Sequence, residues 1–422
     1  MASSLPSQPA CICHRFTSYD PYKTLPRDRV MYARSQQLAM SRLPVLGGTP
    51  ITQELAIALR TVVFGSSITP IRGEWAHTAF TFREPETSLA YGMKCPRNGT
   101  RGLLTAVQAY VLKNLLFPKQ QVVPGVQPVQ QTTVSPDVLL KPSRHKQLEA
   151  LYLSLSDILW RVGERVKVTL ALPSENIYVP HSLQYFTDTI TEKLMLFEVS
   201  DIDELQILIK RYVYLFVEDN GPGALLLLYS AVITRGIDRT LADFQTELNT
   251  HLVCGVPDEG SLCIVMLLLS GRATCHLHNG IVYVGDEEHY AIPQYGVLTR
   301  NEIGFLIYEE SRDEKVPGSR LKTPSVPIWV TCSTGHYGVM FNTNRELLRN
   351  YHAERRFDLI HYSLGGSETA MTIDTRQENI ASSDKSAMEQ EVVPTNVANI
   401  EKIIHTKWND AQLTWNGTIN SL

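Results

Sequence analysis

The chain has 422 residues, of which 43% are hydrophobic and 19% charged, an ordinary composition for a globular protein. Its 39 basic and 43 acidic residues give a net charge of −4, which provides no basic surface for nucleic acid or an anionic membrane. No apolar run approaches the ~18 residues of a membrane-spanning helix, and the N-terminus has no secretory signal. Seven cysteines in so long a chain are typical of reduced thiols, so we expect a cytoplasmic or nuclear protein.

Residues 1–48 are rich in Ser, Pro, Arg and Tyr and show little periodicity. This composition predicts a poorly ordered leader ahead of a domain at residues 49–422. Helical spacing then begins at Ile51, and Thr52 is the predicted N-cap of this helix. Residues 75–82 (WAHTAFTF) alternate in the manner of a strand.

The loop at residues 95–102 (CPRNGTRG) leads into an apolar helical stripe at residues 103–117, which predicts a buried central helix. Residues 119–143 are rich in Gln, Val and Pro and are predicted to form a flexible insertion. Further helices are predicted at 148–160, 207–216 and 225–233, and strands at 166–172, 177–179, 281–284, 328–332, 337–341 and 357–362. Helices first and a β-rich part last predict an α+β fold, with the central helix on a mostly antiparallel sheet.

A loop that enters an apolar helix is a favourable place for a nucleophilic thiol, because the helix N-terminus stabilises a thiolate and an oxyanion. Here the junction holds Arg101, which supplies no nucleophile. Residues 331–341 (TCSTGHYGVMF) predict a hairpin in which His336 heads the return strand, where its imidazole could act as a base. Asp358, on the following strand, could orient His336. An ordinary core helix and a structural histidine are the simpler interpretations of these patterns alone.

Residues 91–108 (YGMKCPRNGTRGLLTAVQ) resemble the active-site segment of the MINDY deubiquitinases, whose pattern is Y-G-x-x-Q-x-K-G-G-P-C-G-V-L-A-x-V-Q. The branch that includes the fourth paralogue is the most similar. The resemblance continues over residues 51–422 through LLLLYSAVITRGI at 225–237, GFL at 304–306, LKTP at 321–324, PIWV at 327–330, FDL at 357–359, IDT at 373–375, TKW at 406–408 and WNG at 415–417.

Matched without gaps, the resemblance implies that the family's nucleophilic cysteine falls on Arg101 and its oxyanion-hole glutamine on Cys95. His336 matches the general base. The resemblance therefore implies a papain-like cysteine-hydrolase core that is a pseudoenzyme, similar to the inactive B-form of the fourth paralogue. The partner that it implies is ubiquitin or polyubiquitin, of the lysine-forty-eight-linked type, with neither nucleic acid nor membrane. No cofactor is expected.

Two alternatives stay open. An active deubiquitinase could use Cys95 as a displaced nucleophile with His336 as its base, although Cys95 lies six residues ahead of Arg101. Metal binding at residues 11–14 (CICH) or 275–278 (CHLH) lacks the paired spacing of structural zinc sites, so no metal site is expected.

Overall fold

The structure, a computed structural model, describes residues 42–71, 73–95, 99–118, 135–244, 250–254, 259–285, 292–309, 316–376 and 395–416. These residues belong to one unit, Arg42–Leu422. Most of the predicted leader, residues 1–41, lies outside the described residues.

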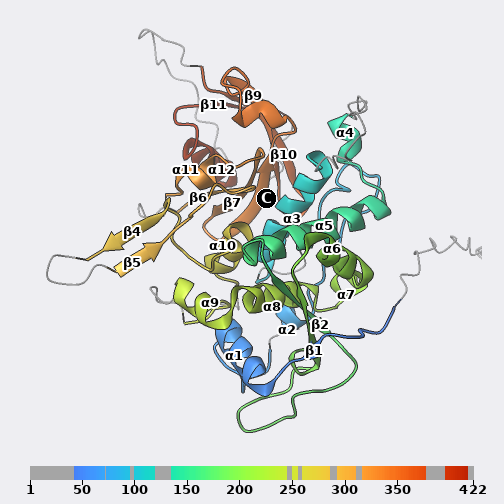
Figure 1. Cartoon of the computed structure of the whole chain (residues 1–422). Coiled ribbons are helices and arrows are strands. Elements are labelled where there is room, and N and C mark those ends of the chain that lie inside the picture. Colours follow the sequence, from blue (N-terminus) through green and yellow to red (C-terminus); the bar gives the residue numbers. More distant parts are fainter. Residues whose placement is uncertain are drawn as a thin grey trace, which may run out of the picture. The chain divides into compact units, whose positions relative to one another are not determined.

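Helices dominate the first two thirds of the described chain (Figure 1). They are α1 (Gln53–Phe64), α2 (Gly73–Ala76), α3 (Arg101–Leu116), α4 (Pro136–Leu139), α5 (Arg144–Val162), α6 (Ile202–Arg211), α7 (Tyr214–Val217), α8 (Gly223–Arg235), α9 (Ile237–Phe244) and α10 (Leu262–Ser270). A small antiparallel sheet of order β1-β3-β2 accompanies them, formed by β1 (Thr49–Pro50), β2 (Val168–Pro173) and β3 (Leu194–Val199), with the short helix η1 (Thr191–Lys193) before β3.

The last third of the chain forms a six-stranded sheet of order β11-β10-β9-β8-β7-β6. Its strands are β6 (Gly304–Tyr308), β7 (Ile328–Ser333), β8 (His336–Phe341), β9 (Arg356–Tyr362), β10 (Glu368–Asp374) and β11 (Gln412–Asn416). Only the pair β6–β7 is parallel within this sheet. The remaining elements are the hairpin of β4 (Ile281–Val284) and β5 (Ile292–Tyr295), and the helices α11 (Ser319–Lys322), η2 (Arg345–Leu348) and α12 (Thr395–His405). A mixture of helices with mostly antiparallel sheets is therefore confirmed.

The predicted central helix is present as α3. It is buried along nearly its whole length and packs against β7, β8, α5 and α10. Apolar residues lie on most sides of α3, so only a position in the interior shields them from water. The first predicted helix is also confirmed as α1, where the Thr52 hydroxyl accepts the N–H of Leu55 at 3.3 Å.

The C-terminal helix α12 closes the sheet on the side of β6 and β7. Trp408, shortly after this helix, lies edge-on to Trp329 of β7 with ring centroids 5.5 Å apart. Ile403 and Ile404 are buried in the same cluster. A chain segment about 70 residues downstream of β7 therefore completes the core of this sheet.

Two strand predictions were wrong. Trp75 and Ala76 belong to the helix α2, and residues 177–179 form no strand. In the first case, Phe80 and Phe82 are both buried, as the alternation suggests, but Phe82 pairs only through an isolated bridge. The alternating pattern thus predicted the burial of Phe80 and Phe82 correctly. A strand, however, also requires a neighbouring strand that pairs with it along several residues.

The predicted insertion at 119–143 is described only from residue 135 onward. That part contains α4, followed by Ser143, which caps α5 by accepting the N–H of Lys146 at 3.5 Å. The structure also joins Cys263 to Cys275, with a Cα–Cα distance of 5.3 Å. The expectation of reduced thiols throughout was therefore wrong for this pair.

Candidate active site

Arg101 is the first residue of α3, at the end of the loop that the sequence singles out. The preceding residue, Thr100, makes no side-chain capping hydrogen bond, so the cap leaves the first N–H groups of the helix unsatisfied. Arg101 is half-buried, and its Nε has no hydrogen-bond partner among the described residues. The first turn therefore combines backbone N–H groups with a guanidinium, an arrangement that stabilises negative charge.

Gly102 brings this first turn close to the hairpin of β7 and β8. A Cβ at Gly102 would lie 3.0 Å from Cγ2 of Val265 and 3.4 Å from the ring of Tyr337. A larger residue would therefore push the helix away from both neighbours. Because Tyr337 directly follows His336, the start of α3 and the predicted base lie at the same end of the sheet.

Cys95 lies on the segment that leads into α3, and Gln108 of α3 holds this segment in place. The Gln108 side-chain oxygen accepts the N–H of Met93 at 2.6 Å. Its amide nitrogen donates to the carbonyl of Tyr91 at 3.0 Å. Gln108 is fully buried, so these bonds form without competition from water and fix the backbone two residues before Cys95.

β9 holds the same segment from the other direction. The phenol of Tyr362 donates to the carbonyl of Met93 at 2.9 Å and accepts a hydrogen bond from Arg83 Nε at 2.8 Å. The phenol of Tyr91 is hydrogen-bonded to Glu368 of β10. Sequence reasoning missed these supporting residues, because each acts through a partner that lies far away in the chain.

Cys95 itself approaches the end of the sheet at which β8 begins. Its N–H donates to the carbonyl of Leu364 at 3.4 Å. Leu364 follows Tyr362, which is paired with Val339 in an antiparallel register. The turn from β9 to β10 follows Tyr362, at the end of the sheet where β8 begins, so the Cys95 segment and the exposed His336 lie at the same end of this sheet.

Asp358 does not lie beside His336, so its predicted orienting role was wrong. The register pairs Phe341 with Ile360, which puts Asp358 next to the far end of β8. The side-chain amide of Asn342, six residues after His336, donates to the Asp358 carbonyl at 2.5 Å, and six residues of extended chain correspond to roughly 20 Å. Asp358 instead accepts a hydrogen bond from Thr372 Oγ1 of β10 at 2.6 Å.

The thiols near this end of the sheet differ in their environments. Burial raises the pKa of Cys332 to about 12, although the Gly335 N–H and the Tyr337 phenol are hydrogen-bonded to it. Burial also raises the pKa of Cys254, which is half-buried. A raised pKa keeps a thiol protonated and therefore unreactive at neutral pH. Cys95 is the half-buried thiol on the segment before α3.

The described residues contain no group of three or more His, Cys, Asp and Glu side chains arranged to hold a metal ion. In the segment 275–278, Cys275 is joined to Cys263 and is thereby withdrawn from metal binding. The segment 11–14 lies outside the described residues. None of the described helices combines the length and hydropathy needed to cross a bilayer.

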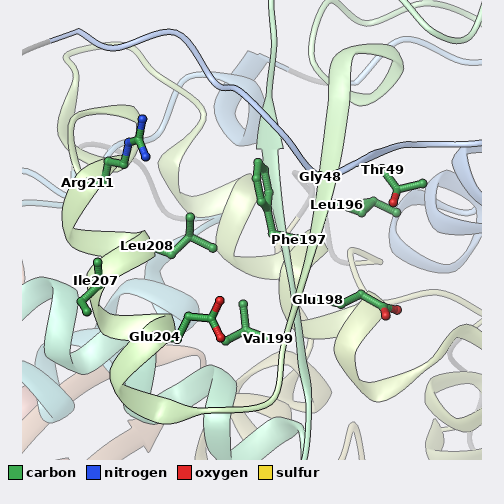
Figure 2. Close-up of a pocket in the computed structure, with 10 residues that line it drawn as sticks. All are labelled: Gly48, Thr49, Leu196, Phe197, Glu198, Val199, Glu204, Ile207, Leu208 and Arg211. Atoms are coloured by element: carbon green, nitrogen blue, oxygen red, sulfur yellow. The ribbon is translucent and has the colours of Figure 1, made fainter.

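A groove of about 450 Å³ lies away from these residues, between the small sheet and α6. Figure 2 shows Phe197 of β3 and Leu208 of α6 on its walls, with Gly48 beside the strand. Neither Cys95 nor His336 lines it. The candidate site is therefore a meeting of three segments, the loop before α3, the first turn of α3 and the start of β8, rather than this groove.

Comparison with known proteins supports the resemblance found in the sequence. The family model described as "Deubiquitinating enzyme MINDY-3/4, conserved domain" matches residues 60–417, which is most of the chain. The chain belongs to the MINDY-3/4 family. Its match includes the loop before α3 and both strands of the β7–β8 hairpin.

Individual relatives of this MINDY-3/4 chain agree with the family match. It is 32% identical over 381 residues to the "Probable ubiquitin carboxyl-terminal hydrolase MINDY-4" of Xenopus tropicalis, covering 89% of this chain and 47% of the relative. It is 31% identical over 373 residues to the human protein of that name, covering 87% and 46%. The "Ubiquitin carboxyl-terminal hydrolase MINDY-3" of Macaca fascicularis is 24% identical over 328 residues, covering 70% of this chain and 67% of the relative.

The chain spans about half the length of the MINDY-4 relatives that it matches. No solved structure shows a significant match. The relatives correct one expectation, namely that the chain is not an enzyme. The family is described as deubiquitinating, and its members are named as ubiquitin carboxyl-terminal hydrolases. That expectation rested on two aligned positions, Arg101 and Cys95, and two positions are weaker support than a match over most of the chain.

Proposed function

We propose that this chain is a cysteine-type deubiquitinase, which cleaves bonds to the C-terminus of ubiquitin in lysine-forty-eight-linked chains. The support is the family membership together with the meeting of Cys95, the first turn of α3 and the start of β8 at one end of the sheet. The proposed core is papain-like, with the thiol before a buried helix and the base on a strand. The proposed domain spans residues 49–422.

In the proposed mechanism, His336 takes the proton of the Cys95 thiol, and Sγ attacks the carbonyl carbon of the last glycine of ubiquitin. When the bond to the lysine amine breaks, the imidazolium returns the proton to that amine, and a thioester remains. His336 then deprotonates a water molecule, which attacks the thioester. Ubiquitin leaves with a free carboxylate, and the thiol of Cys95 is restored.

Arg101 has a defined part in this mechanism. The family pattern has a hydrogen-bond donor at the position of Cys95 and a thiol at the position of Arg101. This chain contains one thiol and one donor in the same loop, with their positions exchanged. The unpartnered Nε of Arg101 and the N–H groups of the first turn of α3 are the proposed donors to the oxyanion.

In this mechanism His336 is the group that activates the Cys95 thiol. Cys95 stands ahead of α3 rather than in its first turn, where the helix dipole acts most strongly, so the dipole contributes little to the thiolate. Replacing His336 with glutamine is therefore expected to lower the rate at which the Cys95 thiol reacts by ~10²–10⁴-fold, which is the typical contribution of a general base.

The test is reaction with ubiquitin that carries an electrophile at its C-terminus. We expect one covalent adduct per chain, which peptide mapping assigns to Cys95 and which Cys95→Ala abolishes. Cleavage of lysine-forty-eight-linked tetra-ubiquitin is expected to disappear in the same variant. Arg101→Met is expected to slow cleavage by about 10²–10³-fold through loss of the oxyanion donor.

Cys254→Ala and Cys332→Ala serve as matched controls, because each removes another thiol of the described chain and is expected to leave the adduct unchanged. An adduct on either of these residues would refute the assignment of Cys95. Absence of both an adduct and cleavage in the unmodified chain would refute the proposed activity itself.

A further inference from the structure

A disulfide joins Cys263 to Cys275, and the proposed mechanism does not use it. The Cα atoms of the two residues lie 5.3 Å apart, and twelve positions separate them in the sequence. Cys263 is 1% exposed and Cys275 is 5% exposed, so the fold encloses the bond. Cys263 is the second residue of α10, and Cys275 belongs to the segment that follows this helix.

The first turn of α10, which contains Cys263, packs against the start of α3. The N–H of Gly260 donates to the carbonyl of Gly99 at 2.9 Å, directly before the N-cap of α3. Cγ2 of Val265 lies 3.0 Å from the position that a Cβ would take at Gly102. A shift in the first turn of α10 is therefore passed on to the first turn of α3, whose N–H groups the proposed mechanism uses.

The segment that holds Cys275 is anchored separately from α10. The carboxylate of Asp243, in α9, accepts the N–H of Ala273 at 3.1 Å. The hydroxyl of Thr274 donates to the carbonyl of Tyr295, in β5, at 2.8 Å. The disulfide therefore ties the first turn of α10 to a segment that two other elements hold in place, and it restricts the conformations that this turn can adopt.

The position of the pair favours thiol–disulfide exchange. Cys275 is the more exposed of the two residues, so an external thiolate reaches it first when the segment opens locally. Cys263 then leaves as a thiolate in the first turn of α10, where the N–H groups of the helix stabilise negative charge. Because a stabilised leaving thiolate speeds the exchange, the pair is suited to reversible reduction.

We propose that the Cys263–Cys275 pair is a redox switch of the proposed active site, set by a small thiol and its disulfide, such as glutathione. The joined pair holds the first turn of α10, and through it the first turn of α3, in the arrangement that the mechanism needs. Reduction frees this turn and slows the reaction of Cys95. The regulation rests on the proposed activity, whereas the exchange at the pair does not.

The reduction takes place in two exchange steps. A glutathione thiolate attacks Sγ of Cys275, the bond to Cys263 breaks, and a mixed disulfide forms. A second glutathione thiolate attacks the glutathione sulfur of this mixed disulfide, and Cys275 leaves as a thiolate together with oxidised glutathione. The two cysteines gain the two electrons that the two glutathione molecules lose. The protons of the two glutathione thiols end on the two cysteine thiols.

Equilibration with glutathione tests the exchange itself. The unmodified chain is incubated at ratios of reduced to oxidised glutathione that run from oxidising to reducing, quenched with acid and mapped by mass spectrometry. We expect the pair of Cys263 and Cys275 to change from joined to free within this series. A pair that stays joined at every ratio, or free at every ratio, would overturn the proposal. The same mapping counts the free Cys95 thiol at each ratio.

Amide hydrogen exchange tests the link to α3 without reference to activity. The amides of residues 104–107 bond to the first turn of α3, beginning with Leu104, which donates to Thr100 at 3.0 Å. On reduction of the pair, we expect these amides to exchange about tenfold faster. The helix α6 is the internal reference, because it packs against α5 and β3. Unchanged exchange at 104–107 would refute the link.

Reaction with the ubiquitin electrophile tests the regulation. The rate per free Cys95 thiol is expected to fall about tenfold on reduction, since small displacements of reacting groups are costly. An equal rate in both states would refute the switch. If no adduct forms in either state, the proposed activity itself fails, and the hydrogen exchange at residues 104–107 then decides the link by itself.

Two variants separate this pair from the other thiols. Cys275→Ala cannot form the bond, so it is expected to show the faster amide exchange and the slower reaction at every glutathione ratio. Cys254→Ala removes a thiol outside the pair and is the matched control, expected to respond to glutathione as the unmodified chain does. A Cys275→Ala chain that still responds like the unmodified chain would refute the proposal.

Discussion

Replacing Gln108 with leucine is expected to lower the free energy of unfolding by roughly 2–5 kcal/mol, because two buried backbone groups lose their partner. The N–H of Met93 and the carbonyl of Tyr91 both depend on the Gln108 amide. Leucine has a similar volume but neither donates nor accepts a hydrogen bond. The midpoint of urea-induced unfolding, compared with that of the unmodified chain, measures the loss.

The same substitution tests whether Gln108 positions Cys95. If it does, the folded variant should react with the ubiquitin electrophile at least tenfold more slowly, since a displacement of about 1 Å in a reacting group already costs about 10²-fold. Gln206→Leu, on the partly exposed face of α6, is the matched control and should change stability by less than about 0.5 kcal/mol. An unchanged midpoint for Gln108→Leu would contradict the buried bonds.

Acidification is expected to destabilise the fold through His361. This histidine of β9 is fully enclosed beside Gly338, and burial lowers its pKa to about 4. In the unfolded chain the pKa is about 6.5, so the unfolded state binds a proton first as the pH falls. The stabilisation is thus complete above pH 6.5 and decreases between pH 6.5 and 4, by about 3 kcal/mol in total.

The pH dependence has a direct control. His361→Gln keeps an amide beside the Thr331 hydroxyl, which lies 3.2 Å from His361 Nε2, but cannot titrate. Its unfolding midpoint should vary less between pH 6.5 and 4 than that of the unmodified chain. His352→Gln, at an exposed position, should leave the original slope. Equal slopes for the unmodified chain and His361→Gln would show that another group carries the effect.

These two residues each contact a segment of the proposed active site. Gln108 holds the segment before Cys95 from within α3, and His361 lies beneath the β7–β8 hairpin that carries His336. Either change therefore acts on the relative placement of the proposed thiol and base.

The sequence correctly predicted those elements that are determined by residues close together in the chain. The helix after Thr52 and the apolar α3 were found because capping residues and apolar periodicity act over neighbouring residues. The hairpin at residues 328–341 was found for the same reason. The strand predicted at 75–82 failed because a strand is defined by its partner, and no extended partner runs beside it.

The residues of the candidate site also fall into two groups, those that the sequence indicated and those that only the structure showed. The loop before α3 and His336 are visible in the sequence, through composition and through the resemblance to the MINDY deubiquitinases. Asp358 was misassigned because sequence order says that two strands are adjacent but does not give their register, which puts this residue at the wrong end of β9. The supporting residues Gln108 and Tyr362 were missed because their hydrogen bonds link the 91–95 segment to partners up to 269 residues apart.

The sequence by itself determined the family of this chain, its buried central helix, and the identity of the residues in the loop that precedes it. Motifs and periodicity involve residues that are close together in the chain, so they can be read from the sequence without a structure. The tertiary structure alone decided which thiols are enclosed and which carboxylate is distant from His336. Burial and register arise from contacts between distant segments, and these exist only once the chain has folded.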